Sequence, residues 1–164
     1  MTASAPIVHP QRRPPVVPER SCLLSLLRAA AAEARAAPRL GLGPACALIA
    51  ADPDAGAARH ADALVRVLPE ALARRPVIRM PGGGAASFDE AWACALLEAD
   101  RRGDAASVVF LLHRRVAAPA RGRLLALVRG LRVALDAARA EASFAGSRAS
   151  RGQPGPYSAE RTRP

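Results

Sequence analysis

Apolar residues recur at helical spacing through most of the chain from residue 21 to residue 142. Leu and Ala repeat between Ser21, a residue type that caps helices, and Pro38, which stops them, so a first helix is predicted there. Over 55–74 the apolar side chains fall on one stripe at i, i+3, i+4 and i+7 spacing, which predicts a second, amphipathic helix. Pro69 lies inside this segment and is expected to kink or end the helix.

The strongest local signals mark a pair of helices in the second half of the chain. Ser87 and Glu90 have the spacing of a capping box, in which each side chain accepts a hydrogen bond from the other residue's backbone N–H. Gly103 and Asp104 then end one helix and cap the next, because Gly tolerates a left-handed backbone and Asp is a good N-cap. A second arm over 105–116 completes a predicted helical hairpin. The expected buried stripe of the first arm is Phe88, Trp92, Ala95, Leu96 and Ala99.

A last helix is predicted from Pro119 to about Glu141, and its core positions are Leu124, Val128, Leu131 and Leu135. Apolar periodicity is absent on either side of the helical segments. Residues 1–20 contain five prolines, and residues 143–164 are rich in Gly, Ser and Pro. The predicted organisation is therefore one helical domain over 21–142, flanked by two disordered tails.

Three short apolar segments leave the fold class open. The segment near 45–51 is too short and too uniformly apolar for periodicity to separate a buried strand from a turn of helix, and 76–80 is predicted to be a short extended segment. The main prediction is a mainly α bundle of about five helices, with two short strands allowed at these segments. The alternative is a small α/β domain, in which 45–50, 77–80 and 108–112 form a parallel sheet. Ala and Leu are poor strand formers, which favours the helical prediction.

The composition fits a soluble domain in a reducing compartment. Hydrophobic residues make up 51% of the chain and aromatic residues only 3%, so Leu, Val and Ala must build the core. Cys22, Cys46 and Cys94 are far apart and form no Cys-x-x-Cys pair, so a disulfide framework is not expected. The N-terminal segment lacks the apolar run of a secretory signal, and no stretch is long and uncharged enough to predict membrane insertion. These features predict a cytoplasmic location.

The formal net charge of +10 has two interpretations. All 24 basic residues are Arg, and Lys is absent. Heavy use of Ala, Arg, Gly and Pro is typical of a GC-rich genome, so codon bias alone accounts for part of the charge. The other interpretation is a functional basic surface for an anionic partner. The sequence leaves both open.

The last helix and the residues before it supply the most specific charge pattern. Arg121, Arg132 and Arg139 fall on one side of the predicted helix, beside its apolar stripe, and Arg129 is nearby. With Arg114 and Arg115 they form a predicted partner-binding ridge. The expected partner is an acidic protein surface, and nucleic acid is the alternative. A merely solvated face whose Arg stems cover the edge of the core is the simplest interpretation.

No complete catalytic or metal-binding constellation is present in the sequence. Cys94 with His60 or His113 is the one cysteine-based pair that resembles a nucleophile and its base, but no local motif surrounds it. The histidines are too dispersed for a zinc site, so no metal and no cofactor is expected. The loop 82–87 is a weak candidate for a small-molecule or anion site, because helix N-termini attract anions. The sequence therefore favours a noncatalytic interaction or regulatory protein.

Overall fold

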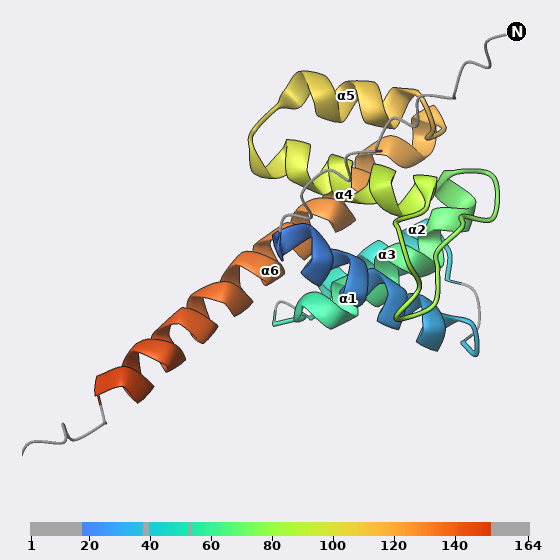
Figure 1. Ribbon diagram of the computed structural model, residues 1–164. Helices are drawn as coiled ribbons and strands as arrows, with labels where there is room; N and C mark the ends of the chain where they lie inside the picture. The colour runs from blue at the N-terminus through green and yellow to red at the C-terminus, as the bar shows by residue number, and fades with distance from the viewer. Residues whose placement is uncertain (1–17, 38–39, 53, 152–164) are drawn as a thin grey trace, which may run out of the picture.

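A computed structural model describes residues 18–37, 40–52 and 54–151 (Figure 1). This part of the chain contains six helices and no strand. The helices are α1 (Pro18–Ala34), α2 (Leu42–Ala50), α3 (Ala57–Ala71), α4 (Phe88–Arg101), α5 (Ala105–His113) and α6 (Ala118–Arg151). The mainly α prediction is confirmed, with six helices where about five were expected. Within the described residues, none of the helices is long and apolar enough to cross a membrane.

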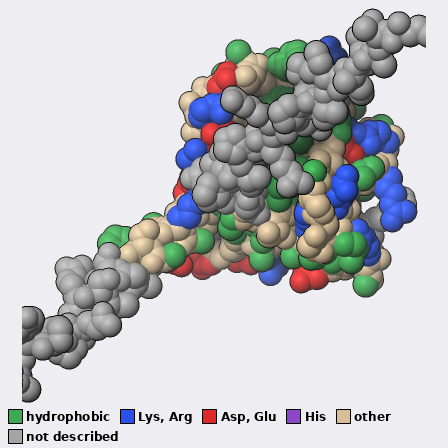
Figure 2. All heavy atoms as spheres, in the orientation of Figure 1, with side chains coloured by type: hydrophobic (Ala, Val, Ile, Leu, Met, Phe, Trp, Pro, Cys, Tyr) green, Lys and Arg blue, Asp and Glu red, His purple; other side chains and the backbone are tan. Residues whose placement is uncertain are grey.

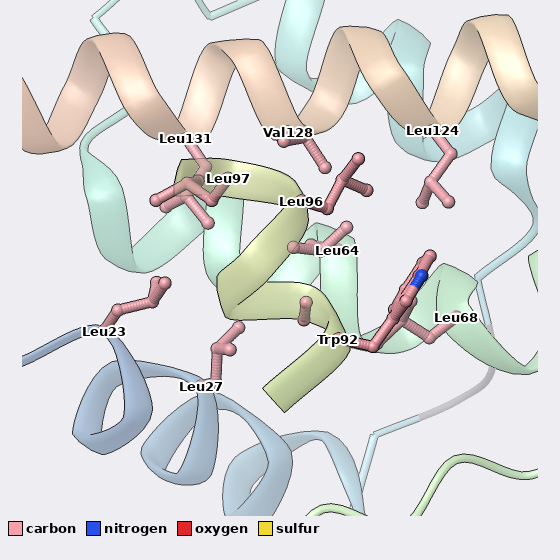
Figure 3. A pocket seen from close by; sticks show the side chains of 11 residues that line it. Leu23, Leu27, Leu64, Leu68, Trp92, Leu96, Leu97, Leu124, Val128 and Leu131 are labelled. Atoms are coloured by element: carbon pink, nitrogen blue, oxygen red, sulfur yellow. The ribbon is translucent and has the colours of Figure 1, made fainter. Parts of the chain in front are cut away.

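Helix α3 lies at the centre of the bundle. It packs against α6 and α1, and more locally against α2, while α4 lies across α1 and α6 and carries α5 on its outer side (Figure 1). Leucines from four helices meet in the core, where they leave only about 10 Å³ of free space (Figure 3). They include Leu27 of α1, Leu64 of α3, Leu96 of α4 and Leu124 and Leu131 of α6. The core is thus built from Leu, Val and Ala, as the composition requires.

Gly130 of α6 is in close contact with α3 through the side chain of His60. The ring of His60, which is buried on α3, lies where a side chain at residue 130 would be: an added Cβ would be 2.6 Å from both Cδ2 and Nε2. His60 is held there because its Nδ1 lies 3.2 Å from the carbonyl oxygen of Gly56. The absence of a side chain at Gly130 therefore sets how closely α3 and α6 pack.

The α/β alternative is wrong. Residues 42–50 form α2, which buries Leu42 and Ala45 in the core, and residues 108–112 lie inside α5. Residues 76–80 form neither a helix nor a strand. The Ala-rich composition explains the outcome for α2, because Ala is the best helix former and a poor strand former.

The signals that bound the hairpin are confirmed. Ser87 and Glu90 form a complete capping box at the start of α4, Gly103 has a positive φ of 69°, and Asp104 accepts a hydrogen bond from the Ser107 N–H at 3.0 Å. One member of the predicted stripe is wrong: Phe88 is 76% exposed. It is the first residue of α4, and it faces Arg115 rather than the core.

Several helix boundaries differ from the predictions. Helix α1 begins at Pro18 rather than after Ser21, as Pro is well tolerated in a first turn. Pro69 does not end the second helix early, since α3 continues to Ala71. Helix α6 continues to Arg151, past the end expected near Glu141, so the first part of the predicted C-terminal tail is helical. The rest of both predicted tails, residues 1–17 and 152–164, lies outside the described residues.

Candidate functional site

The connection between α3 and α4, residues 72–87, positions the candidate site. It leaves α3, runs beside the end of α1 and returns to the N-terminus of α4 (Figure 1). Two adjacent carboxylates in the first turn of α4, Asp89 and Glu90, hold it in place. Both are buried, with exposed fractions of 4% and 1%.

Glu90 binds three separate parts of the chain. Its carboxylate accepts hydrogen bonds from Arg28 of α1 at 2.8 and 3.1 Å, from the Arg79 N–H at 2.9 Å and from the Ser87 N–H at 2.7 Å. Arg28, also buried, donates further to the carbonyl oxygens of Gly83 and Gly84. Burial alone would raise the pKa of Glu90, but the bonds from Arg28 and the two backbone N–H groups lower it to about 2. The carboxylate is therefore ionised and fixes the loop to α1.

Asp89 performs the same role for the first half of the loop. It accepts hydrogen bonds from the Val77 N–H at 2.7 Å, from Arg74 at 2.5 and 3.1 Å and from Arg115 at 2.5 Å. The Arg115 guanidinium also lies over the rings of Phe88 and Trp92, 4.7 and 5.3 Å from their centroids. Such cation–π contacts add to the ion pair. The loop is thus fixed at both ends by buried, charge-assisted bonds.

The turn that leads from α3 into the loop carries backbone strain. Ala73 has a φ of 49°, which is the left-handed region that non-glycine residues rarely adopt. This turn ends α3 and sends the next two residues, Arg74 and Arg75, to the surface beside α1. The strain is maintained because Asp89 fixes Arg74 and Val77 on the far side of the turn.

A groove of about 610 Å³ lies between the ends of α1 and α3 and this loop. Its apolar lining consists mostly of small side chains, and no carboxylate is among the lining residues. Four arginines line it: Arg35, Arg66, Arg74 and Arg75. Figure 2 shows basic side chains gathered on the right of the molecule, which is where Figure 1 places the loop and the end of α1.

Two of these arginines are neutralised by carboxylates outside the groove. Arg66 pairs with Asp62 at 3.3 Å and Arg74 pairs with Asp89. Arg35 instead donates to uncharged acceptors, the carbonyl oxygen of Ile78 at 3.2 Å and the sulfur of Met80. The exposed Arg75 side chain has no carboxylate partner within the described residues. The groove therefore carries about two positive charges that no nearby carboxylate offsets.

The six arginines of the predicted ridge do not form one free basic surface. Arg129 and Arg132 share Asp100, each at 3.0 Å, and Arg132 also contacts Asp136 at 3.4 Å. Asp136 lies 3.3 Å from Arg139 as well. These acidic residues offset much of the charge on this part of α6. The ridge as a partner-binding surface stays a prediction, with a lower net charge than the sequence implies.

The other ridge residues lie at the end of α5 and the start of α6. Arg115 has a side chain only 12% exposed and is occupied by Asp89, and Arg121 donates to the Val116 carbonyl oxygen at 2.9 Å. Arg114 is exposed and lies over the ring of Phe110, which is itself 61% exposed. Of the six, Arg115 is the one that acts in holding the α3–α4 loop.

The weak anion site predicted at 82–87 is already used by the protein itself. The Glu90 carboxylate takes the position that an external anion would take at the start of α4, where it binds the Ser87 N–H. The Gly83 and Gly84 carbonyl oxygens, which would repel an anion, accept from Arg28. In this arrangement the 82–87 segment is bonded to Arg28 of α1 and Glu90 of α4, and it connects these two helices.

The cysteine and histidine candidates are dispersed over the fold. Cys94 is buried on α4, and His113 is exposed at the end of α5. His60 faces Gly130 of α6. Within the described part of the chain, no group of three or more His, Cys, Asp or Glu side chains could hold a metal ion.

Comparisons with protein-family models, with curated proteins and with solved structures find no match to this chain. The candidate site therefore rests on the geometry of the groove. Sequence reasoning missed its four arginines. The available signal was the Arg74–Arg75 pair directly after the amphipathic helix and before Pro76, a position where side chains point to solvent.

Proposed function

We propose that this protein is a noncatalytic interaction protein that binds an acidic segment of a protein partner in the groove between α1, α3 and the α3–α4 loop. The observation that supports the proposal is the groove lining itself: four arginines and no carboxylate, in a chain where most other basic side chains described above have acidic neighbours. Concentrated charge of one sign in a concave surface steers an oppositely charged partner and fixes its register.

The shape of the groove favours a peptide segment over a flat surface. Ala31, Ala34, Val65 and Pro69 supply an apolar lining next to the charged side chains. An acidic segment with one or two small apolar side chains fits both features, because the apolar groups cover the lining while the carboxylates meet the arginines. The buried bonds of Asp89 and Glu90 support binding by holding the loop in place before the partner arrives.

A charge-reversal experiment tests the proposal. The probe is a fluorescently labelled peptide of alternating Glu and Leu, and its binding is measured by anisotropy at low and at physiological salt. The double variant Arg35→Glu, Arg75→Glu is expected to lose at least tenfold in affinity, because it replaces the two unpaired charges. The matched control is Arg114→Glu, Arg129→Glu, which makes the same change of net charge on the predicted ridge.

The outcomes separate the groove from the alternatives. Loss of binding in the groove variant alone supports the proposal. Loss in the control alone moves the partner site to the ridge, and no binding by the unmodified protein overturns the proposal. Tighter binding of a duplex DNA probe, with a steep fall of affinity as salt is added, would replace the acidic peptide by nucleic acid. Circular dichroism of each variant checks that the helices are retained.

The proposed location is the cytoplasm. The three cysteines, one exposed, one half-buried and one buried, form no disulfide within the described residues, which supports a reducing compartment.

A further inference from the structure

We propose that the acidic segment carries a phosphoryl group, and that this group is bound by Arg35, which follows α1, and by Arg75 of the α3–α4 loop, two residues that line the groove. This inference rests on the proposed function and names the chemistry of its ligand. The groove contains two arginines, Arg35 and Arg75, that have no carboxylate partner within the described residues.

The charge balance favours a phosphate ester over a single carboxylate. Arg66 and Arg74 are paired with Asp62 and Asp89, so the uncompensated charge comes from Arg35 and Arg75. A phosphoserine carries about 1.5 to 2 negative charges at pH 7, which matches two guanidinium groups. One carboxylate would leave one of the two arginines without a counter-charge.

Contacts hold the Arg35 side chain and leave some of its N–H groups free, and Asp89 holds the residues on either side of Arg75. Arg35 comes from the end of α1 and is fixed by the Ile78 carbonyl oxygen and the Met80 sulfur, bonds that use only part of its five N–H donors. Arg75 lies between Arg74 and Pro76, and the next residue, Val77, is bound by Asp89. A guanidinium presents a planar fork of donors that fits phosphate oxygens. The two side chains therefore offer a phosphoryl group donors from two separate elements.

The lining favours a phosphorylated peptide over a nucleic acid, which also carries phosphate. No aromatic side chain is among the groove residues, so bases would find no stacking surface there. The small apolar side chains Ala31, Ala34 and Val65 instead suit the side chains next to a phosphorylated residue. A phosphopeptide uses both parts of the groove.

The test compares three labelled peptides of one sequence, with Ser, phosphoserine or Glu at the central position, bound to the full chain. The phosphoserine peptide is expected to bind at least tenfold tighter than the Ser peptide and several-fold tighter than the Glu peptide. Arg35→Gln and Arg75→Gln should each remove most of this phosphate-dependent gain and leave the affinity for the Ser peptide within about twofold. Arg114→Gln, on the exposed end of α5, is the matched control.

A pH series supplies a second readout. The second pKa of a phosphate ester is about 6, so the advantage over the Glu peptide should fall several-fold between pH 7.5 and pH 5.5. Arg does not titrate in this range and Glu titrates below it. Inorganic phosphate at millimolar concentration should compete with the phosphoserine peptide and leave the weaker Ser peptide unaffected.

The inference and the proposed function fail in different ways. Equal affinity for the phosphoserine and Glu peptides overturns the phosphoryl inference and leaves acidic-segment binding standing. No binding of either peptide overturns both. A single-stranded RNA probe that binds tighter than the phosphoserine peptide, and loses this affinity in the two groove variants, overturns the peptide as the source of the phosphate. Unchanged thermal unfolding of each variant shows that binding losses are local.

Discussion

Removing the charge of Glu90 is expected to destabilise the whole fold, because this carboxylate links α1, the α3–α4 loop and α4. Its side chain is fully buried and its partner Arg28 is only 9% exposed. Glu90→Gln keeps the size of the side chain but leaves the Arg28 guanidinium buried beside a neutral amide. Breaking a buried ion pair from one side typically costs about 3 to 5 kcal/mol. We expect a loss of this size in the free energy of unfolding at pH 7.

The pKa of Glu90 gives an independent measure of the same interaction. It is about 2 in the folded protein, against an ordinary value of 4.5. Above pH 4.5 both the folded and the unfolded states are ionised, and the stabilisation is fully present. As the pH falls from 4.5 towards 2, the Glu90 carboxylate becomes protonated in the unfolded state but stays ionised in the folded state, so stability is progressively lost. At about 1.4 kcal/mol per pH unit, this difference corresponds to about 3 kcal/mol.

Urea unfolding followed by tryptophan fluorescence measures both effects. Trp92 is the single tryptophan of the chain and is buried. It lies two residues after Glu90, so its fluorescence reports on this part of α4. The control is Glu98→Gln on the same helix, where a half-exposed carboxylate pairs with Arg101 and Arg102. Such surface pairs contribute about 0 to 1 kcal/mol. Equal losses for the two variants, or an acid sensitivity between pH 4.5 and 2.5 that Glu90→Gln leaves unchanged, would refute the reasoning.

Three further predictions concern the two glycines of α6, the turn at Ala73 and the C-terminal end of α6. Gly130→Ala should destabilise the protein by about 1 to 3 kcal/mol through the clash with His60. Gly122→Ala, at a position on the same helix that faces open space, should raise the free energy of unfolding by up to about 1 kcal/mol. Equal effects of the two substitutions in chemical denaturation would contradict this packing. Ala73→Gly should raise the thermal midpoint because it relieves the positive φ, and Ala106→Gly within α5 should lower it. Truncation after Phe144 should leave the free energy of unfolding within about 0.5 kcal/mol, since Leu135 is the last buried residue among the α6 side chains that the structure describes, which end at Phe144. A larger loss would show that the end of α6 supports the core.

The sequence predicts those parts of the fold that depend on neighbours in the chain. The Ser87–Glu90 box, the Gly103–Asp104 junction and the stripe from Leu124 to Leu135 are all determined within one or two helical turns, and all are found in the structure. Helix α2 could not be assigned, because nine residues that are almost uniformly apolar show no periodicity.

The candidate site depends on contacts between distant segments, which local patterns do not contain. Phe88 fits an apolar stripe, yet it is exposed because Arg115 arrives from the end of α5 to pair with Asp89. Arg35 and Arg75 line one groove although they are far apart in the sequence, and Glu90 contributes to this by binding both Arg28 of α1 and the loop. The ridge prediction counted arginines of the last helix and of the residues before it, and could not include Asp100, which reaches Arg129 and Arg132 from α4.

The length of α6 gives the protein a built-in spacer. The helix has 34 residues, which corresponds to about 50 Å at 1.5 Å per residue. Among its side chains that the structure describes, Leu135 is the last buried one, and Figure 1 shows the C-terminal part of the helix projecting away from the bundle, on the side opposite to the α3–α4 loop. A dye, surface linker or fused domain attached near the end of α6 would therefore stand well clear of the groove, so single molecules can be tethered there while ligand is exchanged freely.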